Sequence, residues 1–301
     1  MSVRAAYLGV ILIWATTPLA IKWSGDGPGF LFGVTGRMVV GALLALAVAR
    51  LAGLRLRRGR RAAHAYLAAG LGIYGSMLCT YWAAQHIPSG WVSVVFGLSP
   101  ILTGVLAAFC LSGAGLTPPR LAGALLGLAG LGVIFGRGAA LDTGAAHGIG
   151  AVLVAVLIYS TSGVCVKRIG TGVPALALVA GGLSVAAPLF ALTWLFADAS
   201  WPTQVPVRAA GAILYLAVMG SVVGFALFYH LLANLDASRV ALITLITPIA
   251  ALLLGHFLNA EPLTPGVWLG AGLVVTGLAV FEFGDRMGGA ELPVPEQADA
   301  G

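Results

Sequence analysis

One arginine stands inside a long apolar run. Arg37 lies about eight residues into the apolar stretch 29–50. An arginine at the centre of a membrane helix costs roughly 2.5–3.5 kcal/mol to insert, so it must face a protein interior or a cavity. Two roles are open: a structural arginine bonded to backbone carbonyls, or a cavity cation that receives a substrate carboxylate. No Asp or Glu lies deep in any apolar run, so the sequence offers Arg37 no intramembrane acidic partner.

A second group combines aromatic rings with small hydroxyls at mid-depth of two apolar runs. An amphipathic ligand needs a mostly apolar pocket with a few placed polar groups, and these residues suit one. Helix packing with hydroxyls bonded back to the preceding turn explains them equally well, and aromatic residues near the end of a span also suit the membrane interface. The candidates are Trp14, Thr16, Thr17, Tyr81, Trp82, Tyr159, Ser160 and Thr161.

A third group holds candidates for gating or for coupling to protons. Lone lysines at helix ends reach the membrane interface or pair with another helix end. Prolines inside apolar runs kink helices, and histidines titrate near neutral pH but more commonly serve packing or hydrogen bonding. The candidates are Lys22, Lys167, Pro100, Pro248, His230 and His256.

Enzyme and metal motifs are missing from the sequence. It contains no H-E-x-x-H, no G-x-S-x-G and no intramembrane carboxylate pair. Its three cysteines, Cys79, Cys110 and Cys165, lie far apart without metal-ligand spacing. We therefore expect no catalytic residue, no metal and no cofactor, and we do not predict an enzyme.

The composition indicates an integral membrane protein. The 301 residues are 59% hydrophobic and 9% charged, against roughly 25% charged residues in soluble domains. A span needs about 20 mostly apolar residues, which predicts an all-α protein with ten transmembrane helices. The predicted spans are 5–23, 29–50, 64–86, 89–111, 118–136, 148–166, 173–196, 208–233, 239–259 and 264–283.

The basic residues predict the orientation. With the N-terminus inside, the inner loops and span ends hold twelve of the 16 Lys and Arg, including Arg57 and Arg58. Positive charge in short cytoplasmic loops sets topology, so both termini are predicted to be cytoplasmic, in an inner or plasma membrane. No nucleic-acid module accompanies this charge, so no nucleic-acid partner is expected. The expected partners are membrane lipids and a small-molecule substrate.

The chain repeats itself after about 147 residues. Ile13–Lys22 matches Ile158–Lys167 in its aromatic residue, hydroxyl cluster and final lysine, and Ser99-Pro100 matches Thr247-Pro248. Because each half has five spans, the halves must lie in opposite orientations, an arrangement typical of secondary transporters. The predicted units are 1–138 and 146–284, followed by a disordered cytoplasmic tail at 285–301.

These residues resemble the drug/metabolite transporter superfamily, in particular its EamA-type members with two five-helix repeats. The markers are Ile13 to Lys22, Arg37, the stretch from Tyr81 to Ser99-Pro100, and Leu258–Thr264, which is similar to a family signature Leu-Gly-Glu-Arg-Leu-Thr. The first half departs from that signature because 112–117 has no glutamate. The resemblance implies a central cavity and the export of small metabolites, with aromatic amino acids as the leading substrate class.

We therefore predict a secondary transporter that works by alternating access. An importer or facilitator of a nucleobase, an organic cation or a drug is the alternative, and a channel or a membrane enzyme is a weaker one because neither a filter-like ring nor a catalytic motif is present. Transport without coupling and coupling through a histidine both remain open, as do monomer and homodimer.

Overall fold

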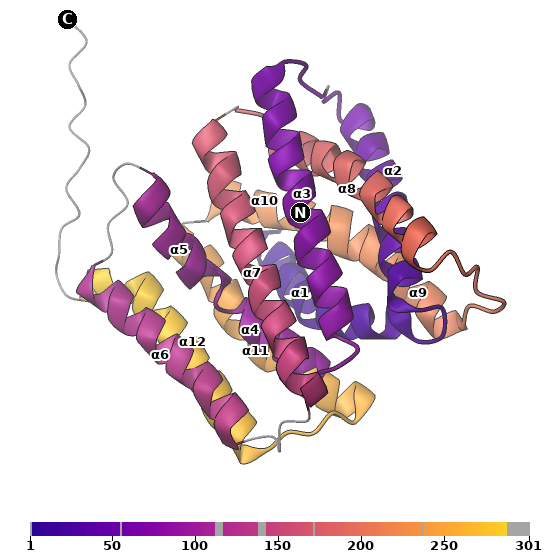
Figure 1. The fold of residues 1–301 in the computed structure, drawn as a ribbon. Helices are drawn as coiled ribbons and strands as arrows, with labels where there is room; N and C mark the ends of the chain where they lie inside the picture. The colour runs from indigo at the N-terminus through magenta and orange to yellow at the C-terminus, as the bar shows by residue number, and fades with distance from the viewer. Residues whose placement is uncertain are drawn as a thin grey trace, which may run out of the picture.

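The computed structural model describes residues 2–54, 56–111, 117–137, 143–170, 172–235 and 237–287, and every regular element in those ranges is a helix (Figure 1). Residues 112–116 lie outside the described residues, and so does the predicted tail 285–301 except for its first three residues, which belong to the last helix. The helices are α1 (Val3–Gly25), α2 (Phe30–Leu51), α3 (Arg60–Ala83), α4 (Ser89–Phe96), α5 (Ser99–Cys110), α6 (Pro118–Arg137), α7 (Thr143–Ile169), α8 (Ala175–Ala197), α9 (Val207–Tyr215), the π-helix η1 (Leu216–Val223), α10 (Gly224–Asn234), α11 (Ala237–Asn259) and α12 (Pro265–Met287).

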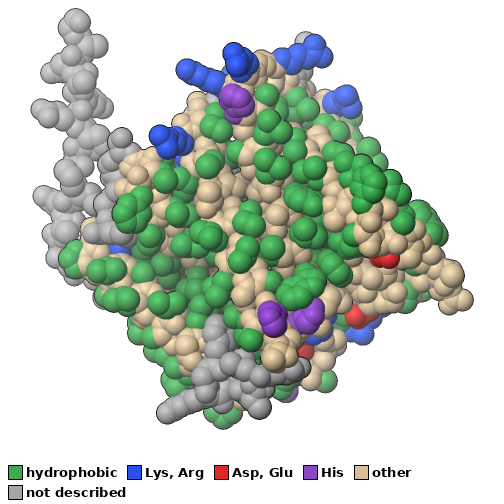
Figure 2. Space-filling model, viewed as in Figure 1, with side chains coloured by type: hydrophobic (Ala, Val, Ile, Leu, Met, Phe, Trp, Pro, Cys, Tyr) green, Lys and Arg blue, Asp and Glu red, His purple; other side chains and the backbone are tan. Residues whose placement is uncertain are grey.

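These helices correspond to the ten predicted membrane spans. Eight of them are long and apolar enough to cross a bilayer, counting α4 with α5 and α9 with η1 and the start of α10, and α6 is a slightly shorter apolar helix. The 24-residue α3 occupies the third predicted span. Figure 2 shows hydrophobic side chains over the middle of the visible face, several Lys and Arg at the top, and further Lys or Arg beside Asp or Glu at the lower right. Leu8, Leu43, Phe109 and Phe196 are between 62% and 84% exposed, as expected for side chains that face lipid.

The helix contacts occur in matched sets. The first span of one half packs on the fourth span of the other, which is seen both as α1 on α11 and as α7 on α4 and α5. The first span of one half also packs on the third span of the other, which is seen both as α7 on α3 and as α1 on α10. Three further contacts join equivalent spans to each other, namely α2 with α8, α4 with α11 and α6 with α12. A two-fold relation between the halves produces this pattern. Since each half has five spans, the fold is the predicted pair of inverted five-helix repeats.

Glycines bring the last span of each half into close contact. A Cβ built on Gly277 of α12 would lie 2.5 Å from the backbone nitrogen of Gly127 on α6, and one on Gly123 would lie 2.5 Å from the backbone oxygen of Gly277. Side chains larger than hydrogen are therefore excluded at this crossing. Small residues permit such approach in membranes, where packing replaces the hydrophobic effect between helices.

Two spans depart from a regular α-helix, and the sequence predicted a kink at Pro100 in one of them. The fourth span breaks after Phe96 and restarts at Ser99, so Pro100 stands in the first turn of α5 rather than inside a kinked helix. Proline lacks an N–H, and the first turn is where a helix tolerates that loss. Its repeat mate Pro248 lies inside α11, which runs unbroken. The eighth span carries the π-helix η1, for which the apolar pattern has no signal.

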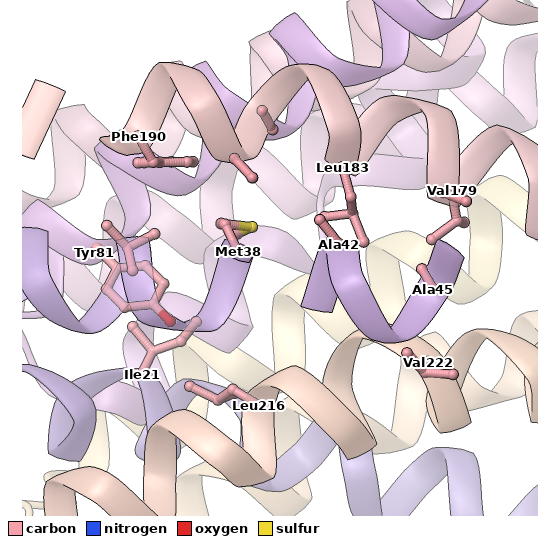
Figure 3. Close-up of a cluster of buried hydrophobic side chains, with 14 of the residues drawn as sticks. Ile21, Met38, Ala42, Ala45, Tyr81, Val179, Leu183, Phe190, Leu216 and Val222 are labelled. Atoms are coloured by element: carbon pink, nitrogen blue, oxygen red, sulfur yellow. The ribbon is translucent and has the colours of Figure 1, made fainter. Parts of the chain in front are cut away.

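A buried cluster joins the halves beside the centre of the bundle (Figure 3). Tyr81 of α3 is fully buried there against residues of α1, α2, α8 and η1, among them Met38, Phe190 and Leu216. This packing fixes the ring of Tyr81. It also fixes the stretch of α2 that carries Arg37, because Met38 is its neighbour in the chain.

Candidate functional site

A cavity of about 240 Å³ lies at the centre of the bundle. Both halves line it: α1, α2, α3, α4 and α5 from the first, and α7, η1 and α11 from the second. Its lining residues are Trp14, Thr17, Pro18, Ile21, Arg37, Met77, Thr80, Val92, Ser93, Phe96, Gly97, Ser99, Tyr159, Gly220, Thr244 and Thr247.

The lining combines aromatic rings, hydroxyls and a single cation. Trp14, Phe96 and Tyr159 supply the rings and Arg37 the charge, and among the described residues no Asp or Glu lines the cavity. Several hydroxyls are already engaged, since Thr17 donates to the carbonyl of Ile13 at 2.6 Å. The surface is thus mostly apolar with a few polar groups, which is the usual lining of a small-molecule site.

Arg37 is 7% exposed and has few partners. Its Nη1 lies 3.5 Å from the Tyr81 hydroxyl oxygen and 3.9 Å from the Met77 sulfur, both long contacts. Its Nε is buried without a hydrogen-bond partner. Lys22 and Arg120 form ion pairs with Glu261 and Asp285, whereas Arg37 pairs with no carboxylate among the described residues. In the part of the chain that the structure describes, the Arg37 guanidinium therefore lies beside the cavity without an acidic side chain to pair with.

The π-helix η1 meets the cavity at Gly220. A Cβ built there would lie 3.4 Å from Arg37 Nη2, so the missing side chain leaves room beside the guanidinium. Ser221 donates to the carbonyl of Leu216, five residues back, at 3.1 Å. Widened turns of this kind are common at functional sites.

The structure brings some of the sequence-predicted site residues together and separates others. Trp14, Thr17, Arg37 and Tyr159 line the cavity. Tyr81 and Ser160 contact lining residues, since Tyr81 touches Arg37 and Ser160 donates to the Ser99 carbonyl at 3.3 Å. Thr16 bonds instead to the Tyr215 hydroxyl at 2.6 Å, outside the lining. Trp82 packs on His86 with ring centroids 4.2 Å apart, and Thr161 and Lys167 are exposed.

Sequence reasoning missed several lining residues. Phe96, Gly97 and Ser93 reach the cavity because the fourth span breaks there, and Thr244 and Thr247 face it from α11. The Ser99-Pro100 and Thr247-Pro248 match was the available signal. A Cβ on Gly97 would lie 3.4 Å from the Pro248 ring, so this proline packs where the helix breaks.

The two histidine candidates lie outside the cavity lining. His230 Nδ1 lies 3.5 Å from Asn234 Nδ2, and its Nε2 is buried without a hydrogen-bond partner. His256 Nδ1 lies 2.8 Å from the carbonyl oxygen of Glu261. This contact ties the end of α11 to the loop that follows it.

A buried carboxylate lies at the end of the bundle where α1 and α11 finish and α4 begins. Glu261 is 6% exposed, and it accepts from Ser89 Oγ at 2.9 Å, from the Gly90 backbone nitrogen at 3.2 Å and from Asn259 Nδ2 at 3.0 Å. Lys22 Nζ lies 3.8 Å from its Oε1. We call Lys22, Ser89, Gly90, Asn259 and Glu261 the Glu261 cluster.

The Glu261 cluster connects the two halves. Lys22 also donates to the Ile87 carbonyl at 3.2 Å, and the adjacent Trp23 donates from Nε1 to Asn259 Oδ1 at 3.0 Å. Glu261 places negative charge at the N-terminus of α4, where helix dipole and free N–H groups favour it. All seven residues of α4 from Ser89 to Val95 are buried, whereas Ile101 is the one buried residue of α5.

Comparison with protein families decides the family. The sequence profile described as the EamA-like transporter family matches the chain twice, over residues 4–136 and 146–283. The chain belongs to this family. The two matches coincide with the two halves of the fold, and together they cover all ten spans.

Other EamA-like transporters and a solved structure are similar over most of the chain. A Streptantibioticus cattleyicolor protein named "Probable terminal-alkyne amino-acid exporter" is 27% identical over 282 residues, 89% of this chain and 92% of that protein. The "Uncharacterized inner membrane transporter YedA" of Escherichia coli K12 is 27% identical, covering 93% of this chain and 90% of its own length. A crystal structure matches with a TM-score of 0.69 and 25% identity over 96% of this chain and 99% of that chain. The protein is therefore a multi-pass membrane transporter of the drug/metabolite type.

Proposed function

We propose that this EamA-like transporter exports a small metabolite, with amino acids as the leading substrate class, by alternating access through the central cavity. The observation that carries the proposal is the position of the cavity: inverted halves enclose it, and each half contributes part of its lining. Rocking inverted halves against each other exposes a midplane site to one side at a time.

The size and charge of the cavity favour an amino acid over the alternatives. At about 240 Å³ it is smaller than the roughly 300–1,000 Å³ typical of sites for drug-sized ligands. An organic cation would meet Arg37 with no acid in the described lining to neutralise it. The relative named as an amino-acid exporter supports the same class and the direction out of the cell.

In this proposal the Glu261 cluster holds one end of the transporter closed. Lys22, Ser89 and Gly90 belong to the first half and Glu261 to the second, so the contacts must separate when the halves move apart at that end. The predicted topology places this end on the outer face. The described state is then one in which the cavity is closed toward the outside.

Transport by purified protein tests the proposal. The full chain is reconstituted in liposomes, and efflux of preloaded labelled amino acids, nucleobases, organic cations and neutral drugs is measured. We expect efflux of one or more neutral amino acids and none of the cations. Efflux of cations alone, or of no compound in any class, would contradict the proposal.

A cavity-filling variant ties that transport to the cavity. Gly220→Leu places a side chain beside Arg37, and we expect it to abolish efflux. Gly211→Leu is the matched control on the same span, because a Cβ on Gly211 meets nothing within 4 Å. Equal efflux by both variants would place the substrate path elsewhere.

A further inference from the structure

Arg37 has unused hydrogen-bonding capacity next to the cavity. A guanidinium carries five N–H donors and no acceptor, and here Nη1 makes two long contacts while the buried Nε makes none. A buried charge without a counter-charge is costly unless something else binds it. This side chain is nine-tenths buried, lines the cavity and lacks an acidic partner.

We infer that Arg37 binds the carboxylate of the substrate and restricts transport to small carboxylates whose remaining part carries no net positive charge, neutral amino acids included. This inference rests on the proposed function. The planar fork of a guanidinium matches a carboxylate with two parallel hydrogen bonds. The fully buried Tyr81 is the positioning residue, because its hydroxyl contacts Nη1 and its ring cannot turn within the packed cluster (Figure 3).

The lining supports a carboxylate better than a phosphate. A phosphate monoester carries close to two negative charges at neutral pH, and Arg37 is the single cation among the described lining residues. One fixed positive charge balances one carboxylate. The rest of the lining is dominated by Trp14, Phe96 and Tyr159, which suit an apolar or aromatic remainder.

The aromatic rings of the lining suit the ammonium group of an amino acid. Trp14, Phe96 and Tyr159 line the cavity, and aromatic faces attract cations. A zwitterion therefore finds a guanidinium for its carboxylate and aromatic faces for its ammonium in the same cavity, although no acidic side chain is present in the described lining.

The test measures binding rather than transport. Acid and amide pairs that differ in charge but little in shape, such as 3-phenylpropionate against 3-phenylpropionamide and butyrate against butyramide, are titrated into the purified full chain in detergent by calorimetry, together with neutral amino acids. We expect the acids and amino acids to bind and each amide to bind roughly 10- to 100-fold more weakly, the range for a hydrogen bond to a charged group. Equal binding of acid and amide, or binding of amides alone, would overturn the inference.

Variants assign the effect to Arg37. Arg37→Met should abolish the preference for acid over amide. Arg37→Lys should weaken this preference, because an ammonium group cannot form the two parallel hydrogen bonds of a guanidinium. Tyr81→Phe should also weaken the preference, but by less than Arg37→Met does. Arg50→Met, in the last turn of the same helix, is the matched control and should retain it. Should Arg37→Met not fold, the acid and amide pairs on the unmodified protein still decide the question.

Failure of the inference and failure of the proposed function give different results. Efflux restricted to compounds without a carboxylate leaves a transporter whose Arg37 is structural. Binding of acids without any efflux leaves an anion site in a protein that does not transport them.

Discussion

Neutralising Glu261 should open the end of the bundle that this residue holds together. The substitution Glu261→Gln keeps the length and shape of the side chain and one acceptor oxygen, but it removes the negative charge. Glu261→Ala would instead leave the buried Ser89 hydroxyl and Gly90 amide without their acceptor, and each buried donor left unsatisfied costs about 1–3 kcal/mol. The conservative variant therefore perturbs the equilibrium with less risk to folding.

The contacts around Glu261 set the magnitude. The bonds from Ser89 at 2.9 Å and Gly90 at 3.2 Å join the halves, and converting each from charged to neutral costs about 1 kcal/mol. The Lys22 pair, at 3.8 Å and 27% exposed on the lysine side, contributes no more than about 1 kcal/mol. If these groups meet water in the open state, the closed state loses about 2–3 kcal/mol. The open-to-closed ratio then rises roughly 30- to 160-fold.

Labelling of a buried cysteine measures this ratio. In a variant whose three native cysteines are replaced, Ser93→Cys places a thiol in the lining on α4, where the side chain is buried. An impermeant maleimide is added from the predicted outer side. We expect labelling to be faster in the Glu261→Gln background by roughly the factor worked out above, so long as opening is rapid relative to the chemical step. Unchanged labelling would refute the argument that Glu261 holds this end closed.

Three further predictions test packing, symmetry and topology. Gly277→Leu should strongly lower the unfolding temperature of the purified protein, because a Cβ at this position would lie 2.5 Å from the backbone of α6. Gly272→Leu on the same helix is the control and should change the unfolding temperature little, because a Cβ there meets nothing within 4 Å. An equal drop in unfolding temperature for both variants would contradict the close packing. Lys167→Gln should leave maleimide labelling at Ser93→Cys unchanged because Lys167 is exposed, and an effect as large as that of Glu261→Gln would show that the two lysines act alike. Single cysteines at positions 58 and 142 should be labelled from opposite sides of the membrane; labelling of both from one side would contradict the topology.

The number of spans and the repeat were readable from the sequence because they depend on local composition. Apolar runs of about 20 residues are forced on any helix that crosses a bilayer, and matched residues such as Pro100 and Pro248 mark the two copies. An odd number of spans in each copy then requires inversion. The same logic singled out Arg37, since a charge in an apolar run is costly wherever the helix lies.

Departures from regular helix were only partly readable. The break between Phe96 and Ser99 comes just before Pro100, which the sequence marked as a helix-kinking proline, whereas Pro248 at the matching position lies inside the unbroken α11. The π-helix at Leu216–Val223 carries no signal in an apolar pattern. Both features line the cavity, so the sequence found Trp14, Thr17, Arg37 and Tyr159 but missed their neighbours.

Residue types and spacing by themselves determined that this chain spans a membrane in two inverted copies and carries one deep positive charge. The tertiary structure decided what surrounds that charge, and which lysine of the matched pair finds a partner. Lys22 meets Glu261 while Lys167 stays exposed. The reason is physical. The cost of burying a group depends on the group and its local run, but the partner that offsets the cost comes from a loop more than two hundred residues away in the chain.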